Sequence, residues 1–170
     1  MATDILQLED LYKTYKNQIY TLCIRLTRSK MQADDLFGET WVKVAEKSDN
    51  LQKGKNPMNY IYTICLNIYR KSAPKWKETD ISDEDAALEI YRKIHDANTD
   101  EMMIEQESMQ QLQQTVSALD DKYRIPIILF YFRELSYNKI SEIMKLPMST
   151  VKFRLNHAKK ILKKEMEGLL

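Results

Sequence analysis

Apolar residues recur every three or four positions over most of the chain, which is the period of helices with one buried face. The N-terminal part predicts three such helices, at about residues 5–29, at 31–47 and from Pro57 onward. The polar stretch 48–56 is expected to be the loop before the third helix, because proline is favoured at the first position of a helix. The expected buried positions are Leu8, Leu11, Tyr12, Tyr15, Ile19, Leu22, Cys23 and Leu26 in the first helix, Leu36, Phe37, Trp41, Val44 and Ala45 in the second, and Ile61, Ile64, Cys65 and Ile68 in the third.

The helical period is lost between residues 74 and 100, where one short helix near residues 85–93 is expected, and it returns near residue 101. A helix over residues 101–119 is followed by another that starts at a cap formed by Asp120 or Asp121. Pro126 is tolerated only near the first turns of that helix, because proline removes a backbone hydrogen bond. Its expected core positions are Ile127, Ile128, Tyr131 and Phe132.

Residues 135–164 predict two short helices joined by a tight turn. Ser136 can cap the first helix, Pro147 marks the break, and Ser149 offers an N-cap for the second helix. The apolar residues with helical spacing are Ile140, Ile143 and Met144 in the first helix and Val151, Leu155, Ala158 and Leu162 in the second. This layout is typical of a helix-turn-helix.

The opposite face of the second helix is basic, since residues 150–164 contain six Lys or Arg side chains and no acid. At about 100° per residue, Phe153, Asn156, His157 and Lys160 share that face, with Lys152 and Arg154 beside it. Such a helix suits the major groove of DNA, where cations neutralise phosphates and polar side chains bond base edges. The alternative is a solvated basic face on a C-terminal helix, which the helix dipole also favours.

Charge divides the chain into three parts. The net charge is +3 over residues 1–73, −7 over residues 74–110 and +5 over residues 111–170. Together with only three Gly and four Pro in 170 residues, this predicts an all-α protein of two small helical domains joined by an acidic linker. The expected boundaries are 1–73 for the first domain, 74–104 for the linker and 105–170 for the domain with the helix-turn-helix.

The sequence contains no motif for catalysis, a metal or a cofactor, so we expect a protein that is not an enzyme and needs no cofactor. Cys23 and Cys65 lie on apolar stripes and are expected to be free thiols of the core. The N-terminus is acidic and lacks the layout of a signal peptide, and no apolar run approaches the length of a membrane span. We therefore expect a cytoplasmic protein without membrane insertion.

Three segments resemble motifs of the extracytoplasmic-function (ECF) sigma factors, the small two-domain sigma subunits of bacterial RNA polymerase in the sigma-70 family. LSYNKISEIMKLPMSTVKFRL is similar to the region 4 pattern LSYxEIAEILGIPxGTVKSRL. QADDLFGETWVKVAEK is similar to the region 2.2 pattern DAEDLVQETFLRVW, and PMNYIYTICLNIYRK to the region 2.3–2.4 pattern PxxWLxRIAxNxxxDxxRK. The resemblance covers about residues 5–72 and 105–166, in the family's order.

The resemblance implies a sigma factor that directs core RNA polymerase to promoters and helps to melt the −10 element. Its partners would be promoter DNA, the clamp helices of the largest polymerase subunit and, as in many members, an anti-sigma factor. The implied polymerase contacts are Asp34, Asp35, Leu36, Glu39, Thr40 and Trp41. The implied −10 contacts are Asn50, Lys53, Lys55, Asn56, Asn59, Tyr60, Tyr62, Asn67, Arg70 and Lys71. The implied −35 contacts are Thr150, Lys152, Phe153, Arg154, Asn156, His157 and Lys160.

The chain departs from the family pattern at five positions. Gly38 replaces a usual glutamine and weakens its helix, Thr63 and Leu66 replace common basic residues, His157 replaces a frequent arginine, and Phe153 replaces a small residue. The tyrosines of the third helix could stack on unpaired bases, although burial against the first helix is favoured for each one. Two other functions stay open from the residues alone: a stand-alone helix-turn-helix regulator and a helical protein-interaction module.

Overall fold

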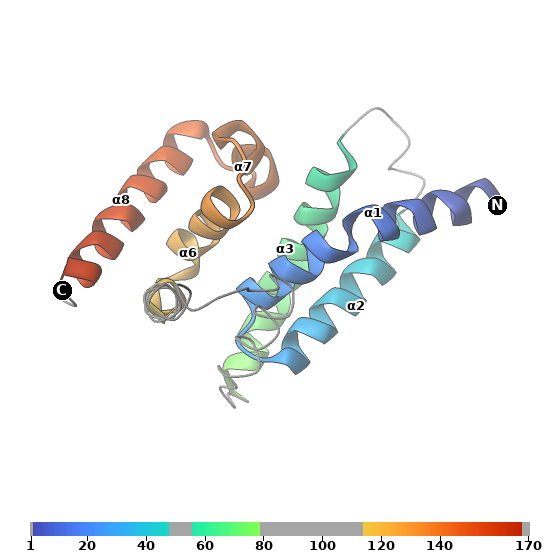
Figure 1. The fold of residues 1–170 in the computed structure, drawn as a ribbon, viewed down its shortest axis with the longest axis horizontal. Helices are drawn as coiled ribbons and strands as arrows, with labels where there is room; N and C mark the ends of the chain where they lie inside the picture. Colours follow the sequence, from blue (N-terminus) through green and yellow to red (C-terminus); the bar gives the residue numbers. More distant parts are fainter. Residues whose placement is uncertain (1, 48–55, 79–113, 168–170) are drawn as a thin grey trace, which may run out of the picture. The chain divides into compact units, whose positions relative to one another are not determined.

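A computed structural model of the protein describes residues 2–47, 56–78 and 114–167, and these residues form helices and turns without any strand (Figure 1). The predicted all-α class is therefore confirmed. The chain divides into two compact units, residues 1–91 and 92–170, and the division falls inside the predicted linker. Residues 79–113 lie outside the described part of the chain, so the helix expected near residues 85–93 and most of the 101–119 helix lie there too.

The first unit is built from α1 (Ala2–Leu26), α2 (Lys30–Glu46) and α3 (Pro57–Glu78), each of which packs against the other two. The apolar stripes meet between them as the helical period predicts. Its fully buried core residues are Ile19, Leu22, Cys23, Leu26, Leu36, Val44, Ile61, Tyr62, Cys65 and Leu66. Two expected core positions are wrong: Ala45 is exposed, and the Tyr12 side chain is 41% exposed although its ring contacts Trp41.

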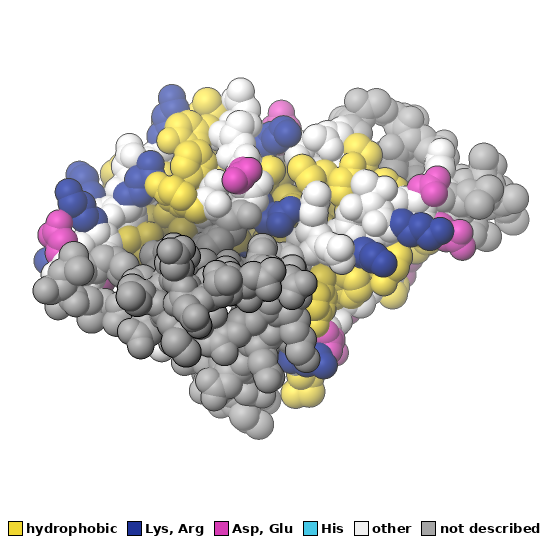
Figure 2. Space-filling model, viewed as in Figure 1, with side chains coloured by type: hydrophobic (Ala, Val, Ile, Leu, Met, Phe, Trp, Pro, Cys, Tyr) yellow, Lys and Arg dark blue, Asp and Glu magenta, His cyan; other side chains and the backbone are white. Residues whose placement is uncertain are grey.

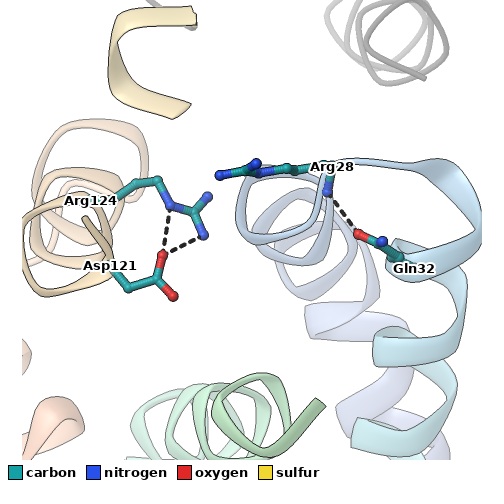
Figure 3. A network of polar contacts seen from close by, with 4 residues as sticks. All are labelled: Arg28, Gln32, Asp121 and Arg124. Carbon is teal, nitrogen blue, oxygen red and sulfur yellow. Dashed lines mark hydrogen bonds and ion pairs between the residues drawn. The ribbon is translucent and has the colours of Figure 1, made fainter. Parts of the chain in front are cut away.

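Local hydrogen bonds set the end of α1, three residues before the predicted end, and the start of α2. The hydroxyl of Thr27 donates to the carbonyl of Cys23, and α1 ends at Leu26 rather than near residue 29. Ser29 caps α2 by accepting a bond from the amide of Gln32 at 3.2 Å. The Gln32 side chain in turn accepts from the amide of Arg28 at 3.2 Å, so the two residues satisfy free amides at the start of α2 (Figure 3).

Pro57 opens α3 as expected, and Asn56 caps it by accepting a bond from the amide of Met58 at 3.1 Å. The helix runs farther than the sequence pattern predicts, through Pro74 to Glu78. Pro74 is exposed while the neighbouring Ala73 is buried, so the turn that loses a hydrogen bond to proline faces solvent. The helix therefore extends five residues into the segment predicted to be linker.

The second unit contains a helical turn at residues 114–118, then α6 (Asp121–Ile127), the π-helical turn η2 (Ile128–Phe132), α7 (Tyr137–Met144) and α8 (Met148–Glu167). α8 packs on both α6 and α7. The buried apolar residues of this unit are Val116, Leu119, Ile125, Ile127, Ile128, Leu129, Leu135, Ile140, Ile143, Met144, Val151, Leu155 and Ala158. Leu162, expected in the same stripe, is half-buried.

The helix that begins at Asp121 changes its hydrogen-bond pattern just after Pro126. The amide of Arg133 donates to the carbonyl of Ile128 at 3.2 Å, a step of five residues in place of four. Residues 125–129 are all buried, whereas Tyr131, expected in the core, is 50% exposed. The wider turn explains this error, because it takes the residues that follow out of the 3.6-residue period.

One charged side chain is buried in α6. Arg124 is 3% exposed, and its Nε and Nη2 donate to Oδ1 of Asp121 at 3.1 and 3.0 Å (Figure 3). The helical pattern did not single out this arginine. Burial of a guanidinium is costly unless a carboxylate compensates its charge, so Asp121 contributes to the stability of this unit. The expected side-chain cap by Asp120 or Asp121 is wrong, because Asp120 occupies the N-cap position and its side chain makes no cap bond.

The structure confirms one of the two predicted N-caps of the helix-turn-helix. Ser136 caps α7 by accepting from the amide of Lys139 at 3.2 Å, and α7 ends at Met144, followed by Lys145 as the C-cap in a left-handed conformation (φ 56°). The expected N-cap Ser149 is wrong. α8 already begins at Met148, and the amide of Val151 donates to the carbonyl of Pro147 at 3.1 Å, which places Ser149 inside the first turn.

Candidate functional site

The exposed face of α8 gathers polar, basic and aromatic side chains on one side of the helix. Lys152, Asn156, His157 and Lys160 are exposed, and Phe153 is 65% exposed, while Val151, Leu155 and Ala158 are fully buried on the opposite side. Thr150 and Arg154 are half-buried at its edges. The face derived from helical angle alone is therefore the face that the structure presents to solvent.

Aromatic contacts order the middle of this face. The rings of Phe153 and His157 lie nearly parallel, with 9° between their planes and 6.0 Å between their centroids. Tyr123 of α6 packs on the imidazole at 4.9 Å, and the ammonium of Lys122 lies 5.0 Å from the Tyr123 ring. Phe153 and His157 are four residues apart, so their contact follows from helical spacing. Nothing in the local pattern singles out Tyr123, because its place depends on how α6 packs on α8.

Basic side chains surround these rings. Figure 2 shows several Lys and Arg side chains on the surface of the unit that ends with α8. None of the exposed Lys of α8 from 152 to 164 forms an ion pair among those described for this unit. An exposed helix with this composition can neutralise phosphates with its ammonium groups and can offer amide, imidazole and apolar groups to base edges.

The exposed face of α2 is acidic. Asp34, Asp35 and Glu39 are exposed, as expected for residues that meet a partner. One carboxylate is already engaged, because the hydroxyl of Tyr20 donates to Oδ1 of Asp34 at 2.8 Å. Burial, followed by this hydrogen bond, raises the pKa of Tyr20 to about 12. Asp35 and Glu39 are thus the carboxylates of this face for which no structural bond is described.

Three other implied polymerase contacts are buried. Leu36 and Thr40 are fully buried, and the hydroxyl of Thr40 donates to the carbonyl of Leu36. Trp41 is 8% exposed and its ring lies 5.1 Å from Tyr12 and 6.3 Å from Phe37. The side chains of these three residues are therefore placed to hold α2 against the other helices rather than to touch a partner directly.

The implied −10 residues lie on different sides of α3. Asn67, Arg70 and Lys71 are exposed, and Asn59 and Tyr60 are half-buried. Tyr62 is fully buried and Tyr69 is only 4% exposed. Both agree with the expectation that a tyrosine of this helix packs in the core. Asn56 is exposed with its carbonyl oxygen engaged as the cap of α3, and Asn50, Lys53 and Lys55 lie outside the described residues.

The two cysteines meet in the core of the first unit. Both side chains are fully buried, both thiols are free, and their Sγ atoms are 3.8 Å apart. The contact with Cys65 together with burial raises the pKa of the Cys23 thiol far above its usual range. In the described part of the chain, no group of three or more His, Cys, Asp or Glu side chains is placed to hold a metal ion. None of the described helices has the length and apolar content needed to cross a bilayer.

A helical unit with an acidic exposed helix, followed by a helical unit that presents a basic recognition helix, defines a two-part helical DNA-binding protein. Known families match both parts in this order. Residues 11–72 match sigma-70 region 2, and residues 109–162 match sigma-70 region 4.

Individual relatives match almost the whole length. The ECF RNA polymerase sigma factor SigW of Bacillus subtilis is 28% identical over 166 residues, covering 94% of this chain and 89% of SigW. The RNA polymerase sigma factor YlaC of the same organism is 29% identical over 163 residues, covering 94% and 91%. The sigma factor RpoE, solved in complex with the anti-sigma factor NepR from Bartonella quintana, has the same fold, with a TM-score of 0.71 at 18% identity over 95% of this chain and 97% of RpoE.

The chain belongs to the sigma-70 family and is a sigma factor of the ECF type, which acts in transcription initiation. The family match decides between the three functions that the residues alone leave open. A stand-alone regulator or a protein-interaction module would not require region 2 and region 4 in sequence.

Proposed function

We propose that this sigma factor reads the −35 element of its promoters with the exposed face of α8. The observation that carries the proposal is the separation of the two sides of this helix. The predicted base-contacting residues Lys152, Phe153, Asn156 and His157 are exposed together, and the opposite side is fully buried. The half-buried Thr150 and Arg154 and the exposed Lys160 would contact phosphates.

In the same proposal, the first unit binds core RNA polymerase and the melted −10 element. Asp35 and Glu39 of α2 would meet the clamp helices of the largest polymerase subunit, with Asp34 beside them. Asn67, Arg70 and Lys71 of α3, together with the loop before that helix, would hold the opened DNA strand. The sigma factor would catalyse no reaction itself, and it would work in the cytoplasm, where polymerase and promoters are.

An anti-sigma factor is a further proposed partner. The proposal is supported by the structural relative RpoE, which was solved with the anti-sigma factor NepR. Co-purification of the tagged chain from its own bacterium in the absence of an inducing stress tests whether such a protein is bound.

The −35 assignment is tested by selecting promoters from a library with a randomised −35 element, using holoenzyme reconstituted with this chain. Asn156→Ala is expected to relax the preference at particular base pairs, at a cost of about 1–3 kcal/mol there. Lys160→Ala is expected to weaken all promoters alike and to reduce the salt dependence of binding. If Asn156→Ala lowered all promoters equally and left every preference intact, base readout by this face would be wrong.

The docking assignment has its own test. The double variant Asp35→Lys/Glu39→Lys is expected to lose co-purification with core polymerase while its thermal melting stays near that of the wild type, because both side chains are exposed. Glu9→Lys/Asp10→Lys is the matched control, since it makes the same change in charge at exposed positions of α1. Retained polymerase binding in the α2 variant would count against the proposed docking face.

A further inference from the structure

The ring cluster formed by Tyr123, His157 and Phe153 crosses from α6 to the recognition helix α8. Tyr123 stands on α6, outside the helix-turn-helix, and nothing in the pattern of sigma region 4 quoted above assigns it a role. Its ring centroid lies 4.9 Å from that of His157, with 42° between the planes. The imidazole is therefore in contact with an aromatic ring on each of two helices.

We infer that Tyr123 is a positioning residue for promoter recognition, which holds the imidazole of His157 in the orientation that meets one base pair of the −35 element. This inference rests on the proposed reading of the −35 element by α8. It assigns a second helix, α6, to sequence specificity, with Tyr123 acting through His157 and not through contact with DNA.

The physical need for such a residue follows from the exposure of His157. An exposed side chain that rotates freely loses conformational entropy when it binds a base, and each ordered side chain reduces the affinity gained. An arginine at this position could form two parallel bonds to guanine, which fixes its own geometry. An imidazole offers one ring nitrogen toward a base, so its direction must be fixed by its neighbours.

The rings of Phe153 and Tyr123 restrict the orientation of the imidazole and leave His157 accessible to solvent. Phe153 stacks nearly parallel to His157 at 9°, and Tyr123 packs at an inclined angle from the side of α6. His157 stays exposed and Phe153 stays 65% exposed, so both remain accessible to the major groove. The half-buried Tyr123 is itself held beneath the exposed Lys122, whose ammonium lies 5.0 Å from its ring.

The experiment uses holoenzyme and the randomised −35 library with four variants. His157→Ala defines the base pair that the imidazole reads, and we expect a loss of preference there of roughly fivefold or more. Tyr123→Leu, which keeps an apolar side chain but removes the ring, is expected to lose the preference at that same base pair and at no other. Tyr123→Phe keeps the ring contact and is expected to retain the wild-type preference.

The double variant Tyr123→Leu/His157→Ala is expected to lose no more preference than His157→Ala alone, because the tyrosine acts through the histidine. An unchanged preference in Tyr123→Leu, or a uniform loss over all base pairs, would overturn the positioning role. If His157→Ala itself left all preferences intact, the proposed −35 reading by this residue would fail instead. Thermal melting of Tyr123→Leu beside Tyr123→Phe distinguishes a folding defect, which would lower binding to every sequence.

Discussion

Gly38 lies in the middle of α2, and replacing it with alanine is expected to stabilise the first unit. α2 runs from Lys30 to Glu46, so Gly38 is eight residues from each end and has no role as a cap. The residue is exposed, and a Cβ atom added to it would meet nothing within 4 Å. The substitution therefore creates no clash and adds no packing, and only the helix propensity changes.

The size of the effect follows from that isolation. Glycine in a helix interior is about 0.8–1.0 kcal/mol less favourable than alanine, because it loses more backbone freedom on folding. Gly38→Ala is thus expected to raise the free energy of unfolding by about 1 kcal/mol, which corresponds to roughly 4–8 °C in melting temperature for a unit of this size. Gly38→Gln, which restores the residue usual in the family, should give a slightly smaller gain, and Gly38→Val less again because its side chain is β-branched.

The measurement is urea denaturation of the full chain followed by tryptophan fluorescence. Both tryptophans, Trp41 and Trp76, belong to the first unit, so the signal reports the unfolding of that unit alone. A change in midpoint with an unchanged slope is expected. A lower or unchanged midpoint for Gly38→Ala would refute the explanation by helix propensity.

Three further substitutions test other features. Lys145 follows α7 with φ 56°, a conformation that glycine adopts without strain. Lys145→Gly should therefore raise the melting temperature of the second unit by a few degrees, equivalent to about 0.5–1 kcal/mol. The control Glu142→Gly, inside α7, should lower it. Asp121→Ala removes the carboxylate that compensates the buried Arg124 and should lower the free energy of unfolding by about 1–3 kcal/mol, measured by chemical denaturation. The control Asp120→Ala should change it little, because Asp120 is exposed and its side chain makes no cap bond. Equal losses in the two variants would refute the compensation. The pKa of Tyr20 is raised to about 12 in the folded state, from about 10 in the unfolded state. The stability that this group contributes is therefore present below about pH 10 and is lost as the pH rises through about 12. Tyr20→Phe should show a flatter decline of stability over this alkaline range.

The elements most dependent on a single apolar stripe were predictable from sequence. The two faces of α8 follow from Val151, Leu155 and Ala158, because one register of a helix buries all three. The cap of α7 by Ser136 was predictable because serine is a preferred N-cap and stands just before the residues with helical spacing. The exposed acids of α2 were likewise predictable, because they alternate with its buried stripe.

Features that depend on contacts between helices were not predictable. The π-helical turn after Pro126 removes Tyr131 from the core, and a period of 3.6 residues has no means of anticipating it. Arg124 is buried by the tertiary packing of α6, which the helical period does not encode. The cap at Ser29 was not predicted, although Gln32 stands three residues later, a spacing that signals a helix start.

The buried pair of thiols gives this protein a chemical reporter of local opening. The thiolate form of a cysteine attacks thiol reagents, and a fully buried Cys23 with a strongly raised pKa presents almost no thiolate while the core is closed. The chain has two cysteines, and both belong to the unit of residues 1–91. The rate of modification by an aromatic disulfide reagent in native buffer therefore measures how often the three-helix unit opens, in the intact protein and with the helix-turn-helix unit contributing no signal.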